Sequence, residues 1–188
     1  MIRIGITGSI ASGKSTVAQI LSKKKYPLFS ADLVVKKLYR NKTFIKKLKK
    51  VFNLKNKSHI KQSIKETIIK SKINLGKIER IIHPLVRKEM IKFSKAHKQR
   101  KFLLFEIPLL FENRLSKFFN FIIFVHAKKR LRKMRYLSKF KNEKIFTILD
   151  SKQMNPLKKM KKSNHIIINN KTLRHLKNNV NIILGKYE

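Results

Sequence analysis

The apolar residues of the chain gather in short runs that alternate with longer stretches of mixed apolar and polar residues. Five runs are rich in β-branched or aromatic residues and have the length of strands, at residues 2–7, 27–30, 102–106, 121–125 and 165–168. The stretches between them repeat apolar residues every three or four positions, which is typical of helices. This alternation predicts an α/β fold with a five-stranded parallel sheet covered by helices on both faces.

The helical pattern covers eight stretches of the chain. They are expected at residues 14–24, 32–40, 44–52, 60–68, 75–97, 128–137, 142–162 and 172–184. Because proline is tolerated in the first turn of a helix, we expect a new helix to begin at His83-Pro84, and a break near Asn155-Pro156. Residues 138–141 are expected to form a loop. In the last helix the spacing predicts an inward face made of Leu173, Leu176, Val180 and Ile183.

Composition narrows the class of protein. A length of 188 residues suits one compact domain, and 42% hydrophobic residues provide a core. The chain contains no cysteine, which excludes a disulfide scaffold and every thiolate metal site. No apolar run approaches the ~18 residues of a membrane-spanning helix, and the first residues lack the apolar region of a secretory signal. We therefore expect a cytoplasmic protein without a membrane partner.

The charge of the chain has two interpretations. It carries 48 Lys+Arg against 9 Asp+Glu, a formal net charge of +39, which fits a polyanionic partner such as nucleic acid. However, only 10 of the 48 cations are arginine, whereas nucleic-acid readers concentrate arginine and aromatic residues at the contact face. We favour a chain-wide bias toward lysine, and expect nonspecific adhesion but no specific nucleic-acid partner. The sequence leaves the oligomeric state open.

A phosphate-binding motif follows the first predicted strand and opens the first predicted helix. It fits G-x-x-x-x-G-K-[ST] at every fixed position and reads Gly8-Ser9-Ile10-Ala11-Ser12-Gly13-Lys14-Ser15. The glycines let the backbone curl with its N–H groups inward, and the helix adds the positive end of its dipole. Lys14 then reaches the β- and γ-phosphates of ATP, Ser15 offers a hydroxyl to Mg²⁺, and Thr16 satisfies the start of the helix.

Carboxylates are scarce, with two Asp and seven Glu, so those in special places attract notice. Asp32 follows the second strand at the carboxyl edge of the sheet, where it can accept a proton from a hydroxyl or cap the next helix. Glu106 ends the third strand, which we expect beside the first, and this position suits a Mg²⁺ ligand or a simple ion pair with lysine. Glu112 is a further candidate for a helix cap or a substrate contact.

His83 and Arg87 are four residues apart, so they share one helix face. Such a pair binds phosphate where an anionic ligand is present, although a solvated helix face is the commoner explanation. The remaining histidines show no metal-ligand spacing. They are His59, His97, His126, His165 and His175.

Together these residues resemble the dephospho-coenzyme A kinase family over most of the chain. The opening phosphate motif resembles the family's T-G-G-I-G-S-G-K-S-T, and further matches fall in the family's order. They are Ser30-Ala31-Asp32 with D-A-D, His83-Pro84-Leu85-Val86-Arg87 with H-P-L-V-R, Glu106-Ile107-Pro108-Leu109-Leu110-Phe111-Glu112 with D-[IV]-P-L-L-F-E, and Gln153-Met154, Lys159 and Ser163-Asn164-His165-Ile166-Ile167 with Q-M, K and A-D-x-V-I.

The resemblance implies a three-layer P-loop kinase fold, and ATP-dependent phosphorylation of the ribose 3′-hydroxyl of dephospho-coenzyme A. By matched position, Asp32 becomes the base, Glu106 the acid after the third strand, and His83 and Arg87 the acceptor contacts. It further implies a core, a helical acceptor-binding segment and a basic lid. These are expected at 1–40, 98–127 and 163–188 for the core, 41–97 for the acceptor segment and 128–162 for the lid.

The chain departs from the family at several positions. Ser9 and Ala11 replace two glycines of the phosphate loop, Ser30 replaces the first Asp of D-A-D, and Asn164 replaces the Asp of A-D-x-V-I. The family's R-L-x-x-R is shifted in the lid, so three arginines compete for the γ-phosphate. They are Arg130, Arg132 and Arg135. The alternative functions are another small-molecule P-loop kinase and a nucleic-acid-binding P-loop ATPase.

Overall fold

The computed structural model describes residues 1–23, 26–54, 63 and 72–185. The chain divides into two compact units, one formed by residues 1–30 with 94–188 and the other by residues 31–93. None of the helices in the described ranges combines the length and the apolar character that a bilayer crossing requires.

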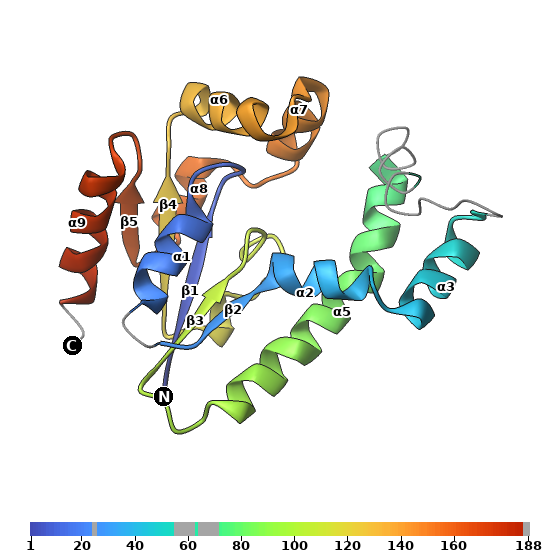
Figure 1. Ribbon diagram of the computed structural model, residues 1–188, viewed down its shortest axis with the longest axis horizontal. Coiled ribbons are helices and arrows are strands. Elements are labelled where there is room, and N and C mark those ends of the chain that lie inside the picture. The colour runs from blue at the N-terminus through green and yellow to red at the C-terminus, as the bar shows by residue number, and fades with distance from the viewer. Residues whose placement is uncertain (24–25, 55–62, 64–71, 186–188) are drawn as a thin grey trace. The chain divides into compact units, whose positions relative to one another are not determined.

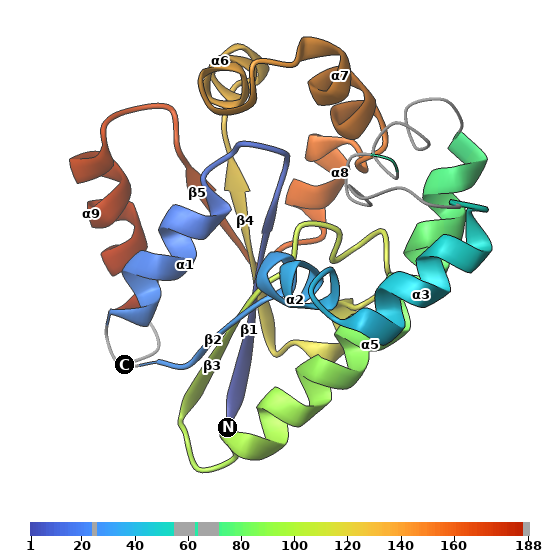
Figure 2. The ribbon, with the colours of Figure 1, turned by 45° about the vertical axis from the view of Figure 1, so that its right-hand side comes forward.

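The first unit contains the parallel five-stranded sheet that the apolar runs predict. Its strands are β1 (Ile2–Gly8), β2 (Leu28–Ser30), β3 (Phe102–Glu106), β4 (Phe121–His126) and β5 (His165–Ile168). They lie in the order β2-β3-β1-β4-β5, so the third strand pairs with the first, as expected. All five point the same way in Figures 1 and 2, and therefore their carboxyl ends share one edge.

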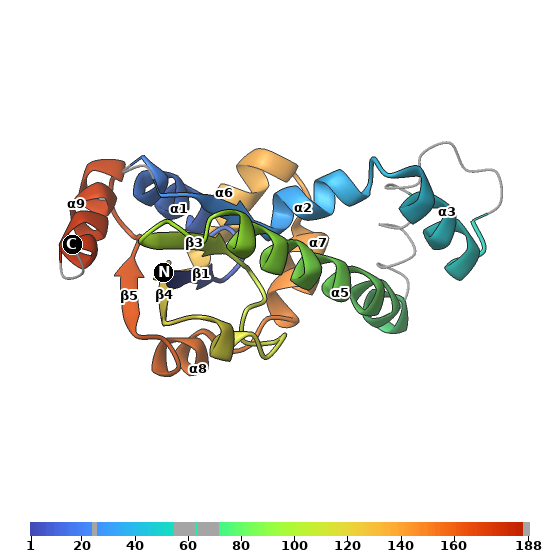
Figure 3. The same cartoon turned by 90° about the horizontal axis from the view of Figure 1, so that it is seen from below.

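Helices cover both faces of this sheet. Figure 3 shows α1 (Lys14–Ser22) and α9 (Leu173–Leu184) together on one face, and α8 (Pro156–Lys161) on the other. The second face is also covered by the connection from β3 to β4, which contains the short helix η1 (Ser116–Phe118) and packs its phenylalanines against Phe105. The three-layer α/β architecture is thereby confirmed. Beyond β4 follow α6 (Lys129–Phe140) and α7 (Glu143–Ser151).

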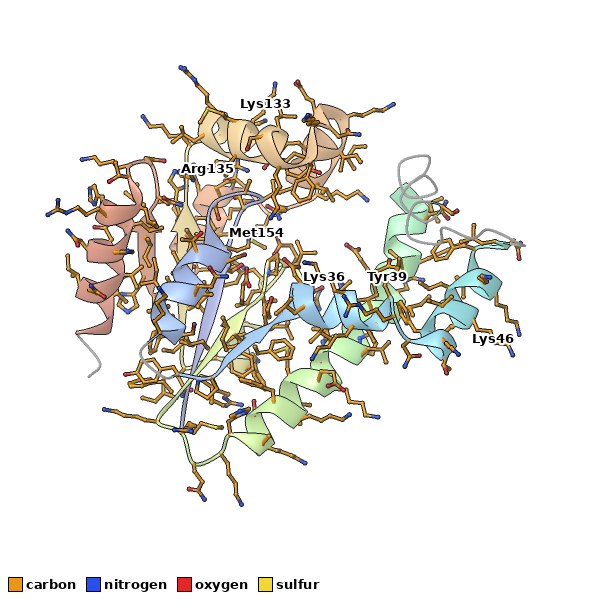
Figure 4. All side chains as sticks on the ribbon, viewed as in Figure 1. Lys36, Tyr39, Lys46, Lys133, Arg135 and Met154 are labelled. Carbon is orange, nitrogen blue, oxygen red and sulfur yellow. The ribbon has the colours of Figure 1, made fainter. Side chains whose placement is uncertain are left out.

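The second unit is helical and has its own small core. Its helices are α2 (Ala31–Leu38), α3 (Lys42–Val51) and α5 (Lys72–Ala96), the last of which runs into the first unit from Ser94. Tyr39, which directly follows α2, meets Phe44 of α3 edge-on with 5.6 Å between the ring centroids, while Lys46 lies on the outside of α3 (Figure 4). The helix expected at 60–68 lies outside the described residues except for position 63.

Three details of the helices differ from the sequence prediction. No new helix begins at Pro84, because α5 continues through it, with Ile78 before the proline and Met90 after it both buried. Packing on both sides offsets the backbone hydrogen bond that a proline removes. The expected loop at 138–141 starts later, because Phe140 is the last residue of α6 and Lys141 is its C-cap. In α9 the predicted inward residue Leu173 is 54% exposed, because it occupies the first helical position, a turn before the buried residues begin.

The crowding at Gly5 predicts a stability effect with a matched control. A Cβ at Gly5 would lie 2.7 Å from Leu110 Cδ1 and 3.0 Å from Phe119 Cγ, whereas one at Gly76, in α5, would have no described atom within 4 Å. Gly5→Ala should lower the free energy of unfolding by about 1–3 kcal/mol through overpacking. Gly76→Ala should raise it by about 1 kcal/mol, as alanine favours helix. Chemical denaturation of both variants checks this, and an unchanged Gly5→Ala midpoint would contradict the packing.

Candidate active site

The phosphate loop has a backbone that only particular residues permit. Gly8 ends β1, and a Cβ there would lie 2.4 Å from the Val125 carbonyl oxygen. Gly13 caps α1 in the left-handed region at φ +97°, with Asn169 Nδ2 only 2.2 Å from where its Cβ would be. Both fixed glycines of the motif are therefore required by the structure. Ala11, at a variable position, also has a positive φ of 57°.

Side-chain donors contact three carbonyl oxygens of the loop. Lys14 Nζ donates to Ser9 O at 2.9 Å, and Asn169 Nδ2 donates to Ser12 O at 2.9 Å. Arg132 Nη1 lies 3.4 Å from Ile10 O. These contacts fix the loop next to the N-terminus of α1, where backbone N–H groups and the helix dipole favour an anion.

An acid lies beside the first turn of α1. Glu106 Oε1 accepts a hydrogen bond from Ser15 Oγ at 2.5 Å, and Oε2 accepts one from Ser30 Oγ at 3.0 Å. The parallel register of β1 and β3 pairs Ile6 with Glu106, which brings the acid level with the start of the phosphate loop. Glu106 is only 5% exposed. The structure thus brings together Ser15 and Glu106, the two expected Mg²⁺ ligands. Ser30, which replaces the first aspartate of the D-A-D motif, donates to the same acid.

The structure separates the three candidate lid arginines. Arg132 is 3% exposed, and its guanidinium donates to Ala127 O at 3.2 Å and pairs with Asp150 Oδ1 at 2.5 Å. Arg135 donates to Asn169 O at 3.0 Å, while Lys133, on another side of α6 in Figure 4, pairs with Glu143 of α7. Arg130 is exposed. Among the three arginines, Arg132 is the one for which a contact with the loop is seen.

Glu112, expected to cap a helix or contact substrate, is occupied by contacts within the first unit. Its Oε1 accepts from Lys159 Nζ at 2.7 Å and from the backbone N–H of Met154 at 2.8 Å. Lys159 is completely buried and also lies 3.3 Å from Pro108 O. Asn164, which replaces a family aspartate, likewise accepts from a backbone N–H, that of Ile122, at 2.8 Å. The amide therefore preserves this acceptor.

The remaining candidates belong to the second unit. Asp32 lies in the first turn of α2, two residues after Ser30, and His83 and Arg87 lie on α5. Burial lowers the pKa of His83 below its usual value, Glu79 opposes this shift and Arg87 adds to it. The neutral form of the His83 imidazole is therefore favoured at pH 7.

A phosphate loop on a parallel sheet, with an acid at the neighbouring strand end, is the arrangement of a P-loop nucleotide-binding protein. The family model described as dephospho-CoA kinase matches residues 2–175 of the chain. A dephospho-CoA kinase from Bartonella quintana is 34% identical over 177 residues, covering 92% of this chain and 91% of its own. One from Fusobacterium nucleatum is 32% identical over 181 residues, covering 92% of each. The chain belongs to the dephospho-CoA kinase family.

Solved structures agree in fold. A Thermus thermophilus protein superimposes with a TM-score of 0.83 at 25% identity, covering 100% of this chain and 98% of its own. Dephospho-CoA kinase from Campylobacter jejuni gives 0.70 at 24% identity, covering 98% and 96%. Shikimate kinase from Acinetobacter baumannii gives 0.59 at 14% identity, covering 99% and 92%, so the scaffold extends to kinases of other small molecules.

The buried pair of Arg132 and Asp150 predicts a stability effect. Asp150→Asn leaves the Arg132 charge, whose side chain is 4% exposed, without its counter-ion, and should lower the free energy of unfolding by about 3 kcal/mol. The matched control is Glu143→Gln, which breaks the exposed pair with Lys133 and should cost less than about 1 kcal/mol. Urea unfolding of both variants compares them. Equal losses would show that the Arg132 pair is no more important than a surface contact.

Proposed function

We propose that this chain transfers the γ-phosphoryl group of ATP to the ribose 3′-hydroxyl of dephospho-coenzyme A, giving coenzyme A and ADP. The observation that carries the proposal is the contact between Ser15, the last residue of the phosphate-binding motif, and Glu106 at the end of β3, in a chain of this family. It supports a site where triphosphate and a divalent cation are held together at the sheet edge.

The phosphate loop supplies the nucleotide-binding groups. Residues 8–16 curl around the triphosphate, with backbone N–H groups and the positive end of α1 directed at its oxygens. Lys14 Nζ, which donates to Ser9 O, finds stronger acceptors on the β- and γ-phosphates. The region from 128 to 162 acts as the lid, and within it Arg132 is the favoured partner of the γ-phosphate over Arg130 and Arg135. Triphosphate then competes with Asp150 for its guanidinium.

Mg²⁺ suits the residues next to this loop. Ser15 Oγ and the Glu106 carboxylate are oxygen donors of the kind that Mg²⁺ binds, and they already lie within hydrogen-bond distance. The described residues contain no cluster of three or more His, Asp and Glu side chains, so phosphate oxygens would complete the set. When bound, Mg²⁺ neutralises charge on the β- and γ-phosphates.

Asp32 is the proposed base. It lies two residues after Ser30, so covalent geometry keeps its Cα within about 7 Å of the Ser30 Cα. Its carboxylate accepts the proton of the 3′-hydroxyl as that oxygen bonds to the γ-phosphorus and the bond from the γ-phosphorus to the bridging oxygen breaks, releasing ADP. His83 and Arg87, in the acceptor-binding segment 41–97, hold the anionic groups of the acceptor. The reaction takes place in the cytoplasm.

The assay that tests this function is ADP release with purified chain, ATP and Mg²⁺, with and without dephospho-coenzyme A. Release should depend on dephospho-coenzyme A and yield coenzyme A. Shikimate, a nucleoside and single-stranded RNA serve as controls for the alternative kinases and for a nucleic-acid-dependent ATPase. Stimulation by one of these controls, with none by dephospho-coenzyme A, would overturn the proposal.

A pair of substitutions separates the base from the phosphate loop. Asp32→Asn should lower kcat by at least about 100-fold, the usual contribution of a general base, while the nucleotide dissociation constant stays unchanged. Lys14→Ala should instead weaken nucleotide binding as well as abolish transfer. Steady-state kinetics and calorimetric titration with a non-hydrolysable ATP analogue measure both. An Asp32→Asn enzyme with normal kcat would remove Asp32 from the base role.

A further inference from the structure

Two adjacent residues, Gln153 and Met154, connect the phosphate loop to the segment that follows β3. Gln153 Oε1 accepts a hydrogen bond from the backbone N–H of Ile10 at 2.8 Å. The backbone N–H of Met154 donates to Glu112 Oε1, also at 2.8 Å. Because Gln153 and Met154 are neighbours in the chain, they connect the backbone of Ile10 in the phosphate loop to Glu112, which follows β3. We call this connection the tie.

The far end of this tie is fixed by a buried charge. Lys159, fully buried, pairs with Glu112 at 2.7 Å and lies 3.3 Å from Pro108 O. Thr7 Oγ1, on the strand that leads into the loop, donates to the same Pro108 oxygen at 3.1 Å. Pro108 O thus links Lys159 to Thr7, the residue that precedes the phosphate loop. A shift of Met154 would disturb the buried ion pair of Lys159 and Glu112, which is costly.

Ile10 is held on both of its peptide groups by residues distant in sequence. Its N–H donates to Gln153, and its carbonyl oxygen lies 3.4 Å from Arg132 Nη1. Gln153 and Arg132 come from opposite ends of the region between β4 and β5. A phosphate loop held in this way has already lost the conformational freedom that anion binding would otherwise have to remove.

We propose that Gln153 is a positioning residue, which fixes Ile10 so that the phosphate loop has its nucleotide-binding shape before ATP arrives. This rests on the proposed function in that the ligand of the loop is a nucleoside triphosphate. Gln153 contributes by holding backbone N–H groups in place rather than by touching phosphate. Glu112 and Lys159 support it by fixing Met154, so Glu112 positions the loop rather than binding substrate.

The test replaces the amide acceptor while preserving side-chain length. Gln153→Met should raise the dissociation constant of a non-hydrolysable ATP analogue, and KM for ATP, about tenfold, because the Ile10 N–H loses its acceptor. KM for dephospho-coenzyme A should stay within twofold. Gln99→Met, at an exposed position, makes the same chemical change and should leave both constants unchanged. Unchanged nucleotide constants in Gln153→Met would overturn the proposal.

Hydrogen exchange of single amides, without nucleotide, tests the tie directly. In Gln153→Met the Ile10 amide should exchange at least tenfold faster, while the Val17 amide, bonded to Gly13 O at 3.0 Å, keeps its rate. Gln153→Glu retains an oxygen acceptor and should keep the Ile10 amide protected. Equal Ile10 exchange in wild type and Gln153→Met would refute the tie, and so would equally fast exchange in all variants, including the wild type.

These measurements separate the failure of the two ideas. Amide exchange and analogue binding need no phosphoryl acceptor, so a chain that ignores dephospho-coenzyme A but shows the Gln153 effects contradicts only the proposed function. A chain that makes coenzyme A with normal kinetics in Gln153→Met contradicts only the positioning role. If Gln153→Met fails to fold, Gln153→Ala is measured in the same two assays.

Discussion

The site depends on one constraint, the parallel pairing of β1 with β3. This register places Glu106 opposite Ile6, next to the start of the phosphate loop, where its carboxylate accepts a hydrogen bond from Ser15 Oγ. If β1 and β3 were antiparallel, their carboxyl ends would lie at opposite edges of the sheet. The phosphate loop follows β1 and Glu106 ends β3, so the parallel strands bring the loop and the acid to the same edge of the sheet.

Because acids are few in this strongly positive chain, their positions help to locate the functional site. Glu106, Glu112 and Asp150 each have a hydroxyl or cation partner near the phosphate loop, in a chain with only nine acids. Because each of these three acids contacts a particular neighbour, the position of an acid in this lysine-rich chain is a better guide to the site than the number of acids.

The sequence predicted whatever depends on local pattern. The five strands, the loop between β1 and α1 and the adjacency of Glu106 followed from apolar runs and from the geometry of parallel sheets. The prediction of a helix start at Pro84 was wrong, because packing against residues distant in sequence stabilises the continuous helix, and a local pattern does not show such packing. Likewise Gln153 and Lys159 appeared only as letters of a motif, since their partners, Ile10 and Glu112, lie 143 and 47 positions away.

Arg132 shows where lysine cannot take over. Its Nε donates to Ala127 O, while Nη1 donates to Ile10 O and to Asp150. The planar guanidinium fixes the directions of these donors relative to one another. A lysine ends in a single ammonium at the tip of its stem, and has no donor where Nε sits. In a chain whose cations are mostly lysine, Arg132 therefore occupies a place that requires the planar, forked shape of the guanidinium and not only its charge.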